Sequence, residues 1–217
     1  MPGLGPRSLA ALALAAVTLG GCVSTGERSI AFVTPGLAES YIPLYMGTPI
    51  GSSRFAAAIV IAPNIAVTND HNLNLISPDT LIARSPAYDL LFFRTERTHA
   101  VAITSPKVGQ AVIAYGQNGR NRRREAKGIV RELNARAIAI CDGCPDRPTI
   151  TYDAQAGEGF SGGPVVDVAS GGVVGITVGY LDGAAEDGGR RMYAMDIDFV
   201  MAEMRRLVPG INAGSGG

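Results

Sequence analysis

The chain has 217 residues, with 19 Lys and Arg against 19 Asp and Glu, and 47% of its residues are hydrophobic. A formal net charge of zero argues against a general electrostatic attraction to nucleic acid or to anionic membranes. The length is sufficient for one domain with a sizeable core, or for one unit of two small barrels. We therefore expect a globular protein with no nucleic-acid partner.

The first residues predict a secretory signal rather than a part of the fold. Arg7 and the free amine precede an apolar stretch, Leu9 to Leu19, that is too short to span a membrane as a mature helix. Its end, Leu19-Gly20-Gly21-Cys22, resembles the lipobox of bacterial lipoproteins. The resemblance implies that residues 1–21 are a signal peptide and that Cys22 carries a lipid. The alternative is an ordinary signal peptide followed by a chance cysteine.

Lipidation would anchor the protein in the bacterial cell envelope, facing the periplasm, because two or three acyl chains hold a protein firmly on a membrane. Val23 follows the cysteine where an acidic residue favours inner-membrane retention in some bacteria, so we expect the outer membrane. Gly, Ser, Thr and Pro are scattered through residues 22–50. This composition predicts a lipidated tether followed by an irregular lead-in strand.

Two apolar runs open the folded part. Phe55 to Ala62 is unbroken, Pro63-Asn64 interrupts the pattern, and Ile65 to Thr68 resumes it. This arrangement predicts a hairpin of buried strands. The hairpin delivers His71, one of only two histidines, at its end. Histidine is the side chain that most often serves as the general base for a serine nucleophile.

A lone carboxylate, Asp89, lies in the strongly apolar segment Ala87 to Phe93, after a plausible strand over Asp79 to Arg84. An acid among hydrophobic residues is costly to bury unless it is paired. Asp89 is therefore the expected partner that orients His71. The alternatives are a turn role for Asp89 after Pro86, and the rival acids Asp70, which adjoins the histidine, and Asp79, which follows Pro78.

The second half continues with short strands at even spacing, which is typical of barrels and sandwiches. The basic run Arg120 to Arg124 is expected to be a solvated hairpin tip, because no aromatic residues interleave it. Asp198 predicts an N-cap for one helix, Phe199 to Val208, and residues 209–217 are expected to be disordered. The expected strands are Ala111–Gly116, Ala126–Leu133, Ala135–Ile140, Thr149–Tyr152, Val165–Val168, Gly172–Tyr180 and Met192–Ile197.

Cys141 and Cys144 bracket Asp142-Gly143, a pair of residues favoured in hairpin turns. In an oxidising periplasm we expect the two thiols to form a disulfide that fixes one hairpin. The less favoured alternatives are a redox Cys-x-x-Cys, which lacks its strand-to-helix context, and a zinc half-site, which lacks two further ligands. The sequence thus predicts no metal and no other cofactor.

The loop Gly157 to Pro164 reads Gly-Glu-Gly-Phe-Ser-Gly-Gly-Pro. Glycines on both sides of a serine leave its hydroxyl exposed and let backbone N–H groups of the same turn face a substrate carbonyl. Ser161 is the expected nucleophile, and the N–H groups of Gly159 and Ser161 are the expected oxyanion hole. An ordinary Gly/Ser/Pro turn is the alternative. The matching base and acid elsewhere in the chain favour the catalytic interpretation.

With His71, Asp89 and Ser161 in that order, the chain resembles the trypsin/chymotrypsin superfamily, and within it the HtrA-type bacterial envelope proteases, here without a PDZ domain. The resemblance implies an all-β fold of two six-stranded, antiparallel Greek-key barrels with a C-terminal α-helix. Within residues 51–208, the barrels would span about 51–104 and 108–197, and the helix 198–208. The motifs that carry the resemblance are Val67-Thr68-Asn69-Asp70-His71, Tyr88-Asp89-Leu90-Leu91, Val108-Gly109-Gln110, Gly128-Ile129-Val130, Gly157 to Pro164, Gly175-Ile176-Thr177 and Ala194-Met195-Asp196-Ile197-Asp198.

The resemblance implies a serine endopeptidase that hydrolyses peptide bonds of envelope proteins. By analogy Gln155 lies at the base of the pocket for the side chain before the cut, which predicts an uncharged residue there. The expected walls are Ala156, Thr177, Val178, Gly179 and Tyr180. Protein or peptide substrates are then the expected partners, and nothing in the sequence specifies an oligomeric state.

Two departures from the family pattern affect this interpretation. Phe160 stands where the digestive proteases carry an aspartate, so activation by a newly cleaved N-terminus is excluded. The interval between His71 and Asp89 is short, which predicts a trimmed first barrel. Two other functions remain open: a catalytically silent relative that binds peptides or protein partners, and a structural lipoprotein whose glycine-rich turn is only a turn.

Overall fold

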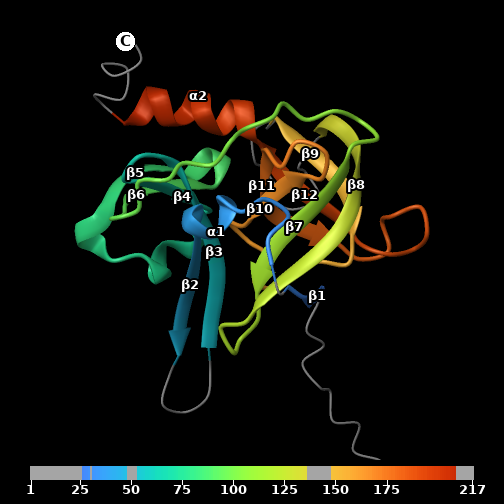
Figure 1. Cartoon of the computed structure of the whole chain (residues 1–217), viewed down its shortest axis with the longest axis horizontal. Coiled ribbons are helices and arrows are strands. Elements are labelled where there is room, and N and C mark those ends of the chain that lie inside the picture. Colours follow the sequence, from blue (N-terminus) through green and yellow to red (C-terminus); the bar gives the residue numbers. More distant parts are fainter. Residues whose placement is uncertain (1–25, 30, 48–52, 136–147, 209–217) are drawn as a thin grey trace, which may run out of the picture.

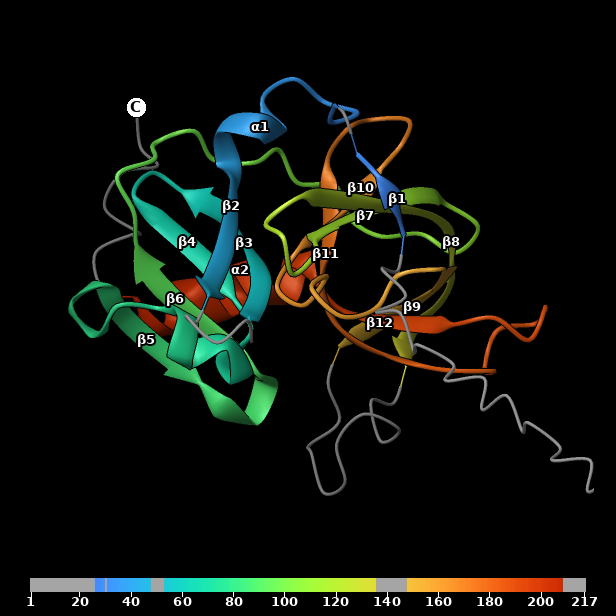
Figure 2. The ribbon, with the colours of Figure 1, turned by 90° about the horizontal axis from the view of Figure 1, so that it is seen from below.

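The structure is a computed structural model that describes residues 26–29, 31–47, 53–135 and 148–208. The strands form two antiparallel sheets that lie side by side (Figures 1 and 2). The C-terminal helix α2 (Ile197–Leu207) lies across their junction, and a short helix, α1 (Leu37–Ser40), precedes the first sheet. The expected all-β class with a C-terminal helix is confirmed.

The first sheet has five strands and contains the predicted β3–β4 hairpin. The described residues show no closure of this sheet into a six-stranded barrel, in contrast to the expectation. The short interval between His71 and Asp89 explains the difference, because it holds only one strand and three 3₁₀ turns, η1 (Asp70–Leu75), η2 (Pro78–Thr80) and η3 (Pro86–Tyr88). In spatial order the strands are β2 (Tyr41–Gly47), β3 (Ser53–Ala62), β4 (Ile65–Thr68), β6 (Leu90–Arg94) and β5 (Leu81–Ser85).

The strand expected over Ala87 to Phe93 begins later, at Leu90. Pro86 starts a 3₁₀ turn, η3 (Pro86–Tyr88), and Asp89 adopts the left-handed conformation with φ 54°. Proline fixes its own φ near −65° and has no N–H to donate, so it favours a turn over a continued ladder. The turn places the Asp89 carboxylate just before the buried strand, which is the position that the site requires.

The second sheet closes into the expected six-stranded barrel, because β8 pairs with both β7 and β9. A two-residue strand, β1, adds to the outside of β8. The predicted disulfide and most of the strand expected over Ala135 to Ile140 lie outside the described residues. In spatial order the strands are β1 (Glu27–Arg28), β8 (Arg123–Ala135), β7 (Ala111–Gln117), β10 (Pro164–Asp167), β11 (Val173–Leu181), β12 (Arg191–Asp196) and β9 (Thr149–Ala154).

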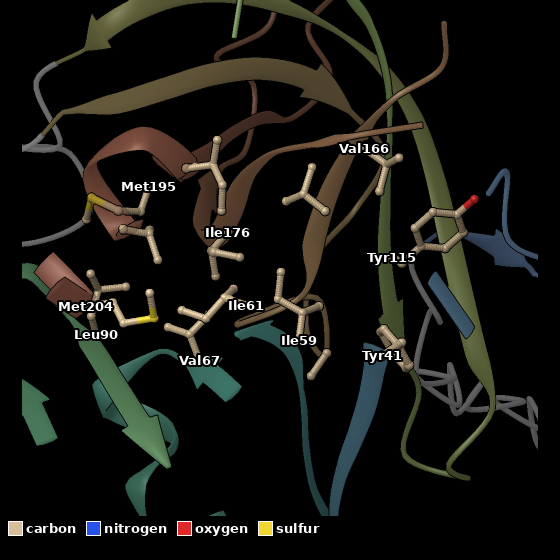
Figure 3. Close-up of a cluster of buried hydrophobic side chains, with 14 of the residues drawn as sticks. Tyr41, Ile59, Ile61, Val67, Leu90, Tyr115, Val166, Ile176, Met195 and Met204 are labelled. Carbon is tan, nitrogen blue, oxygen red and sulfur yellow. The ribbon is translucent and has the colours of Figure 1, made fainter. Parts of the chain in front are cut away.

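A hydrophobic core joins the sheet to the barrel. Figure 3 shows side chains from both units and from α2 meeting there. Val67 and Leu90 come from the sheet, Ile176 and Met195 from the barrel, and Met204 from the helix; all five are almost fully buried. Burying a side chain of this size stabilises the fold by about 1.5–3 kcal/mol. The relative position of the two units, and with it any site between them, is therefore held by packing.

The helix α2 begins at Ile197, two residues before the expected start at Phe199. The expected N-cap was Asp198, but the cap is Asp196, whose Oδ1 accepts the N–H of Asp198 at 2.8 Å. Asp196 and Asp198 both lie near the helix N-terminus, where carboxylates are favourable. Which of them is the N-cap depends on where the preceding strand, β12, ends. Because β12 ends at Asp196, the helix begins at Ile197.

A buried carboxylate on α2 ties the helix to the turn that carries Asp89. Glu203 is 4% exposed; Ser85 donates to its Oε1 at 2.5 Å, and Arg206 donates to Oε2 at 2.8 Å. The hydrogen bonds from Arg206, with that from Ser85, hold the pKa of Glu203 below its ordinary value despite burial. A depressed folded-state pKa stabilises the fold above the unfolded-state pKa of about 4.3, and this contribution disappears as the pH falls through the folded-state value.

The Glu203→Gln variant should therefore be less stable than the native chain by about 1–2 kcal/mol at pH 7, and the difference should shrink as the pH falls below about 4. Denaturant unfolding at a series of pH values measures it. Glu96→Gln, at an exposed position, is the control and should show no such trend. A difference that stays constant down to pH 3 would show that the charge of Glu203 contributes nothing.

Across the described ranges, none of the helices is long and apolar enough to cross a membrane. The predicted signal peptide, the lipidation site at Cys22 and the tail over residues 209–217 lie outside those ranges.

Candidate active site

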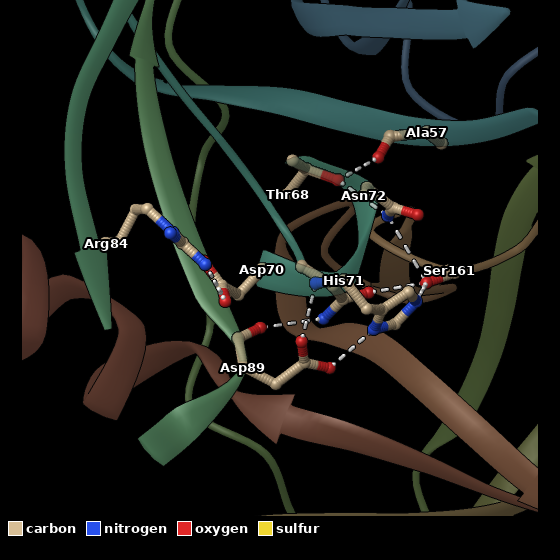
Figure 4. Close-up of polar contacts among 9 residues, drawn as sticks. Ala57, Thr68, Asp70, His71, Asn72, Arg84, Asp89 and Ser161 are labelled. Carbon is tan, nitrogen blue, oxygen red and sulfur yellow. Dashed lines mark hydrogen bonds and ion pairs between the residues drawn. The ribbon is translucent and has the colours of Figure 1, made fainter. Parts of the chain in front are cut away.

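The three residues expected to act together come from separate elements and meet at the junction of sheet and barrel (Figure 4). His71 lies in η1, directly after β4, and Asp89 follows η3. Ser161 lies in the loop between β9 and β10 of the barrel. Packing between the two units therefore brings the base and the nucleophile into contact.

The side chains of the three residues form one continuous chain of hydrogen bonds. His71 Nδ1 lies 2.8 Å from Asp89 Oδ2, and His71 Nε2 lies 2.5 Å from Ser161 Oγ. The other carboxylate oxygen, Oδ1, accepts the backbone N–H of His71 at 3.0 Å. Because the carboxylate fixes a proton on Nδ1, Nε2 is the nitrogen that can take the proton of the serine. This is the geometry that an activated nucleophile requires.

The two rival acids lie elsewhere. Asp70 makes a two-pronged pair with Arg84, through Nε at 2.6 Å and Nη2 at 2.8 Å, and the hydrogen bond raises the pKa of the arginine. Asp79 is exposed in η2. Of the three candidates, only Asp89 contacts the His71 ring in the structure.

Two asparagines near Ser161 were not identified as site residues from the sequence. Asn69 is fully buried; its Oδ1 lies 2.8 Å from Ser161 Oγ, and its Nδ2 donates to the Asp89 carbonyl at 3.2 Å. Asn72 Nδ2 lies 3.3 Å from Ser161 Oγ and 3.1 Å from Thr68 Oγ1. The available signal was a run of polar residues directly after a buried strand. Asn69 is thus a positioning residue that links the nucleophile to the backbone of the acid.

Replacing Asn69 with alanine should slow covalent modification of Ser161 about tenfold and destabilise the fold by about 1–2 kcal/mol, because the hydrogen bond to the Asp89 carbonyl and the contact with Ser161 Oγ are lost. The rate of reaction with a fluorophosphonate and thermal unfolding measure the two effects. Asn74→Ala is the matched control, since Asn74 lies on the same turn but is exposed. Equal rates for the two variants would contradict a positioning role for Asn69.

The loop around Ser161 is held by backbone hydrogen bonds from both units. The Ser161 carbonyl accepts the Ala57 N–H from β3 at 2.9 Å, and the Gly159 carbonyl accepts the Gln117 N–H from β7 at 3.0 Å. Within the described part of the chain, the N–H groups of Gly159 and Ser161 donate to no protein atom. These are the two donors expected to form the oxyanion hole, and they are free for a ligand oxygen.

Glycine is required at two positions of this loop. Gly159 has φ 85°, and a Cβ there would lie 1.9 Å from the Gln117 carbonyl oxygen. Gly162 has φ 75°, and a Cβ there would lie 2.1 Å from the Ala57 carbonyl oxygen. Positive φ is costly for residues with a side chain, and both positions also lack room for one. The close approach of β3 and β7 to the loop explains the glycines that the sequence shows.

Phe160, at the position where digestive proteases carry an aspartate, is fully buried. Its ring packs over Gly116, where an added Cβ would lie 2.7 Å from the ring, and against Gly26 in the lead-in to β1. An apolar anchor therefore holds the loop where the digestive enzymes use an ion pair.

A cleft of about 310 Å³ adjoins Ser161. It extends along η1 and the start of β3, and its surface is mixed, with apolar, amide and charged side chains. Its lining residues are Ser53, Arg54, Phe55, His71, Asn72, Asn74, Leu75, Glu158, Gly159 and Ser161.

None of the six residues expected to form a specificity pocket lines this cleft. Gln155 is exposed, and the Ala156 carbonyl accepts a hydrogen bond from Arg190 Nη1 at 2.8 Å. The Arg190 guanidinium also lies 4.3 Å from the centre of the Tyr180 ring, and its Nε pairs with Asp182 at 2.6 Å. The sequence interpretation missed this cation beside the expected pocket. An uncharged residue before the cut stays a prediction.

The other expected wall residues are largely engaged in packing. The Thr177 hydroxyl pairs with the Tyr152 hydroxyl at 2.9 Å inside the barrel, and Val178 belongs to the core between the two units. Gly179 follows an irregularity in the β11–β12 pairing and is half-buried. The Thr177 and Val178 side chains are therefore engaged inside the protein.

No group of three or more His, Cys, Asp or Glu side chains that could hold a metal ion occurs among the described residues.

Comparison with known proteins adds a family and a fold. A family model described as the trypsin-like peptidase domain matches residues 56–176, more than half of the chain. The active form of the protease Rv3671c from M. tuberculosis matches with a TM-score of 0.62 and 19% identity, over 95% of this chain and 94% of that chain. No curated protein sequence matches significantly.

Two further solved structures show the same fold. The HtrA-type protease AlgW, solved with a tripeptide, matches with a TM-score of 0.65 and 19% identity, over 82% of this chain and 62% of that chain. The MamO protease domain from Magnetospirillum magneticum matches with a TM-score of 0.62 and 16% identity, over 78% of this chain and 98% of that chain. At these identities the matches show a shared fold.

Proposed function

Because the chain belongs to the trypsin-like peptidase domain family, we propose that it is a serine endopeptidase whose catalytic residues are Ser161, His71 and Asp89. The observation that carries the proposal is the unbroken series of contacts from the Asp89 carboxylate through the His71 ring to Ser161 Oγ, at 2.8 and 2.5 Å. An inert glycine-rich turn has no need for this alignment between the sheet and the barrel.

The chemistry follows from the geometry. Ser161 Oγ attacks the carbonyl carbon of the peptide bond while its proton passes to His71 Nε2. Collapse of the tetrahedral intermediate breaks the C–N bond, and the imidazolium returns the proton to the leaving amine. A water molecule then repeats the sequence on the acyl-enzyme and releases the acid. Asp89 keeps the ring in the correct tautomer and stabilises the imidazolium throughout.

The free N–H groups of Gly159 and Ser161 complete the proposal. Negative charge develops on the carbonyl oxygen as the serine attacks, and two fixed donors at this point stabilise the transition state more than the ground state. Each such donor typically contributes about 3–4 kcal/mol. Because no described carbonyl occupies these donors, we propose an oxyanion hole that is already formed in the free protein.

We further propose that the enzyme is a lipoprotein of the bacterial cell envelope that faces the periplasm and cleaves exposed or unfolded segments of envelope proteins. The support is the sequence Leu19-Gly20-Gly21-Cys22 and the signal-like segment before it. Mass spectrometry of the membrane-extracted protein tests this part: a diacylglycerol adduct on an N-terminal Cys22 is the expected result.

The experiment that tests the catalytic proposal is the intact mass of the full chain after treatment with a fluorophosphonate. A single adduct is expected on the native chain and none on Ser161→Ala, since only a serine with a working base reacts rapidly. Hydrolysis of a denatured model protein should show the same dependence on Ser161. A folded native chain without an adduct would contradict the proposal and favour the peptide-binding alternative.

A further inference from the structure

The cleft beside Ser161 lies on the side that receives the leaving half of a cleaved peptide. His71 must deliver its proton to the leaving nitrogen, so the residues after the cut lie on the histidine side of the nucleophile. The cleft extends in that direction, along η1 with Asn74 and Leu75, and along the start of β3 with Arg54. Its lining therefore contacts the part of a substrate that follows the cut.

A basic hairpin tip adjoins the same cleft. Ser53, which lines the cleft, donates from Oγ to the Gly119 carbonyl at 3.3 Å, and Phe55 lies within contact of Gly119. Figure 1 shows the tip between β7 and β8 beside the start of β3. The flanking residues Arg120 and Arg122 are both exposed. Arg54 thus lies on the cleft lining, and Arg120 and Arg122 lie in the adjoining hairpin tip.

Hydrogen bonds made by Asn118 hold the backbone of the hairpin tip. Asn118 Oδ1 accepts the backbone N–H groups of both Arg120 and Arg122 at 3.1 Å, and the Asn118 N–H donates to the Arg122 carbonyl at 2.9 Å. Asn121 adopts φ 54°, a conformation that asparagine tolerates better than most residues. The backbone from which the two arginines project is therefore held by hydrogen bonds, which lowers the cost of ordering the loop around a ligand.

These three arginines have no acidic partner in the part of the chain that the structure describes. Among the described residues, Arg54, Arg120 and Arg122 make no ion pair, and Glu158 is the one acid on the cleft lining. Five other arginines are matched with acids, namely Arg84 with Asp70, Arg131 and Arg191 with Asp153, Arg190 with Asp182, and Arg206 with Glu203. Arg28, Arg94 and Arg205 also lack an acidic partner among the described residues, but they lie outside the cleft lining. In a chain of zero net charge, the three arginines at the cleft are a local excess of unneutralised positive charge.

We propose that the cleft selects peptides that carry aspartate or glutamate within the first few residues after the cut. Arginine pairs with carboxylates through a planar fork, and charges that rim a cleft raise the local concentration of an oppositely charged ligand. The inference rests on the proposed function, which it deepens by naming a substrate class. A solvated hairpin tip without a ligand is the competing interpretation.

Binding is tested without turnover on the full-length Ser161→Ala chain. The probes are three fluorescein-labelled peptides of equal length that contain Glu, Gln or Lys at alternate positions, followed by fluorescence anisotropy. The glutamate peptide should bind about tenfold more tightly than the glutamine peptide, and added salt should reduce the ratio. The ratio should fall to about one when Arg54, Arg120 and Arg122 are all changed to Gln.

The matched control changes Arg28, Arg94 and Arg205 to Gln, which removes the same charge at exposed positions outside the cleft lining. This control should retain the preference. Equal binding of the three peptides, or equal loss in both triple variants, overturns the proposal. Because these measurements use the inactive chain, they stand whether or not the enzyme cleaves peptides.

Cleavage supplies the second readout. The native chain is incubated with a peptide mixture from a digested proteome, and the products are sequenced by mass spectrometry. Acidic residues should be enriched at the first three positions after the cut, and the enrichment should be lost in the Arg54/Arg120/Arg122 variant while fluorophosphonate labelling continues. Cleavage without such enrichment refutes the inference alone, whereas failed labelling refutes the proposed function alone.

Discussion

In the Asp89→Asn variant, Ser161 should be acylated roughly 10⁴-fold more slowly than in the native chain at neutral pH, with little loss of stability. An asparagine preserves the shape of the side chain, but its amide no longer fixes a proton on His71 Nδ1 or stabilises the imidazolium. The carboxylate makes two contacts with His71, to Nδ1 at 2.8 Å and to the backbone N–H at 3.0 Å. The substitution therefore removes the charge while it leaves the turn in place.

Single-turnover acylation by an activated ester, with circular dichroism as a check on folding, measures this effect. Asp70→Asn is the matched control, because Asp70 precedes the histidine but pairs with Arg84 on β5. The control should lose less than about tenfold in rate, since an ion pair near the surface contributes about 1 kcal/mol or less. A larger loss for Asp70→Asn than for Asp89→Asn would refute the assignment of Asp89.

Gly159→Ala should abolish most of the activity and also destabilise the protein. The new Cβ would lie 1.9 Å from the Gln117 carbonyl oxygen and 2.6 Å from the Phe55 ring, at a φ of 85°. The loop must move to relieve these contacts, and the movement takes the Gly159 N–H away from the oxyanion. Loss of one such donor typically lowers the rate by about 10²–10³-fold. We expect a loss of about 2–4 kcal/mol in the free energy of unfolding.

Comparison with Gly109→Ala distinguishes the effect of backbone strain from that of steric collision at Gly159. Gly109 has a similar φ of 82°, but no atom lies within 4 Å of the position of a new Cβ. Its substitution should cost only the backbone strain, about 1–2 kcal/mol, and should leave the labelling rate unchanged. Denaturant unfolding and fluorophosphonate kinetics on both variants make the comparison. If Gly159→Ala labels at the native rate, the Gly159 N–H is not part of an oxyanion hole.

The sequence by itself predicted the class of fold and the order of the candidate triad. The alternation of short apolar runs located β3, β4 and the strands of the barrel, since burial on a sheet imposes a pattern that is visible in one dimension. The Gly157–Pro164 loop identified Ser161 because the glycines it needs are themselves part of the sequence. The motif after β4 and the lone acid before β6 then supplied His71 and Asp89 as candidates.

The tertiary structure alone decided which groups meet. Asn69 contacts Ser161 only because the barrel packs on the sheet, and no spacing within one segment reports a contact between residues 92 apart. The open first sheet, the cap at Asp196 and the place of Arg190 depend in the same way on where neighbouring strands end. Local sequence encodes local conformation and burial, whereas pairing across the cleft depends on how the two units are packed together.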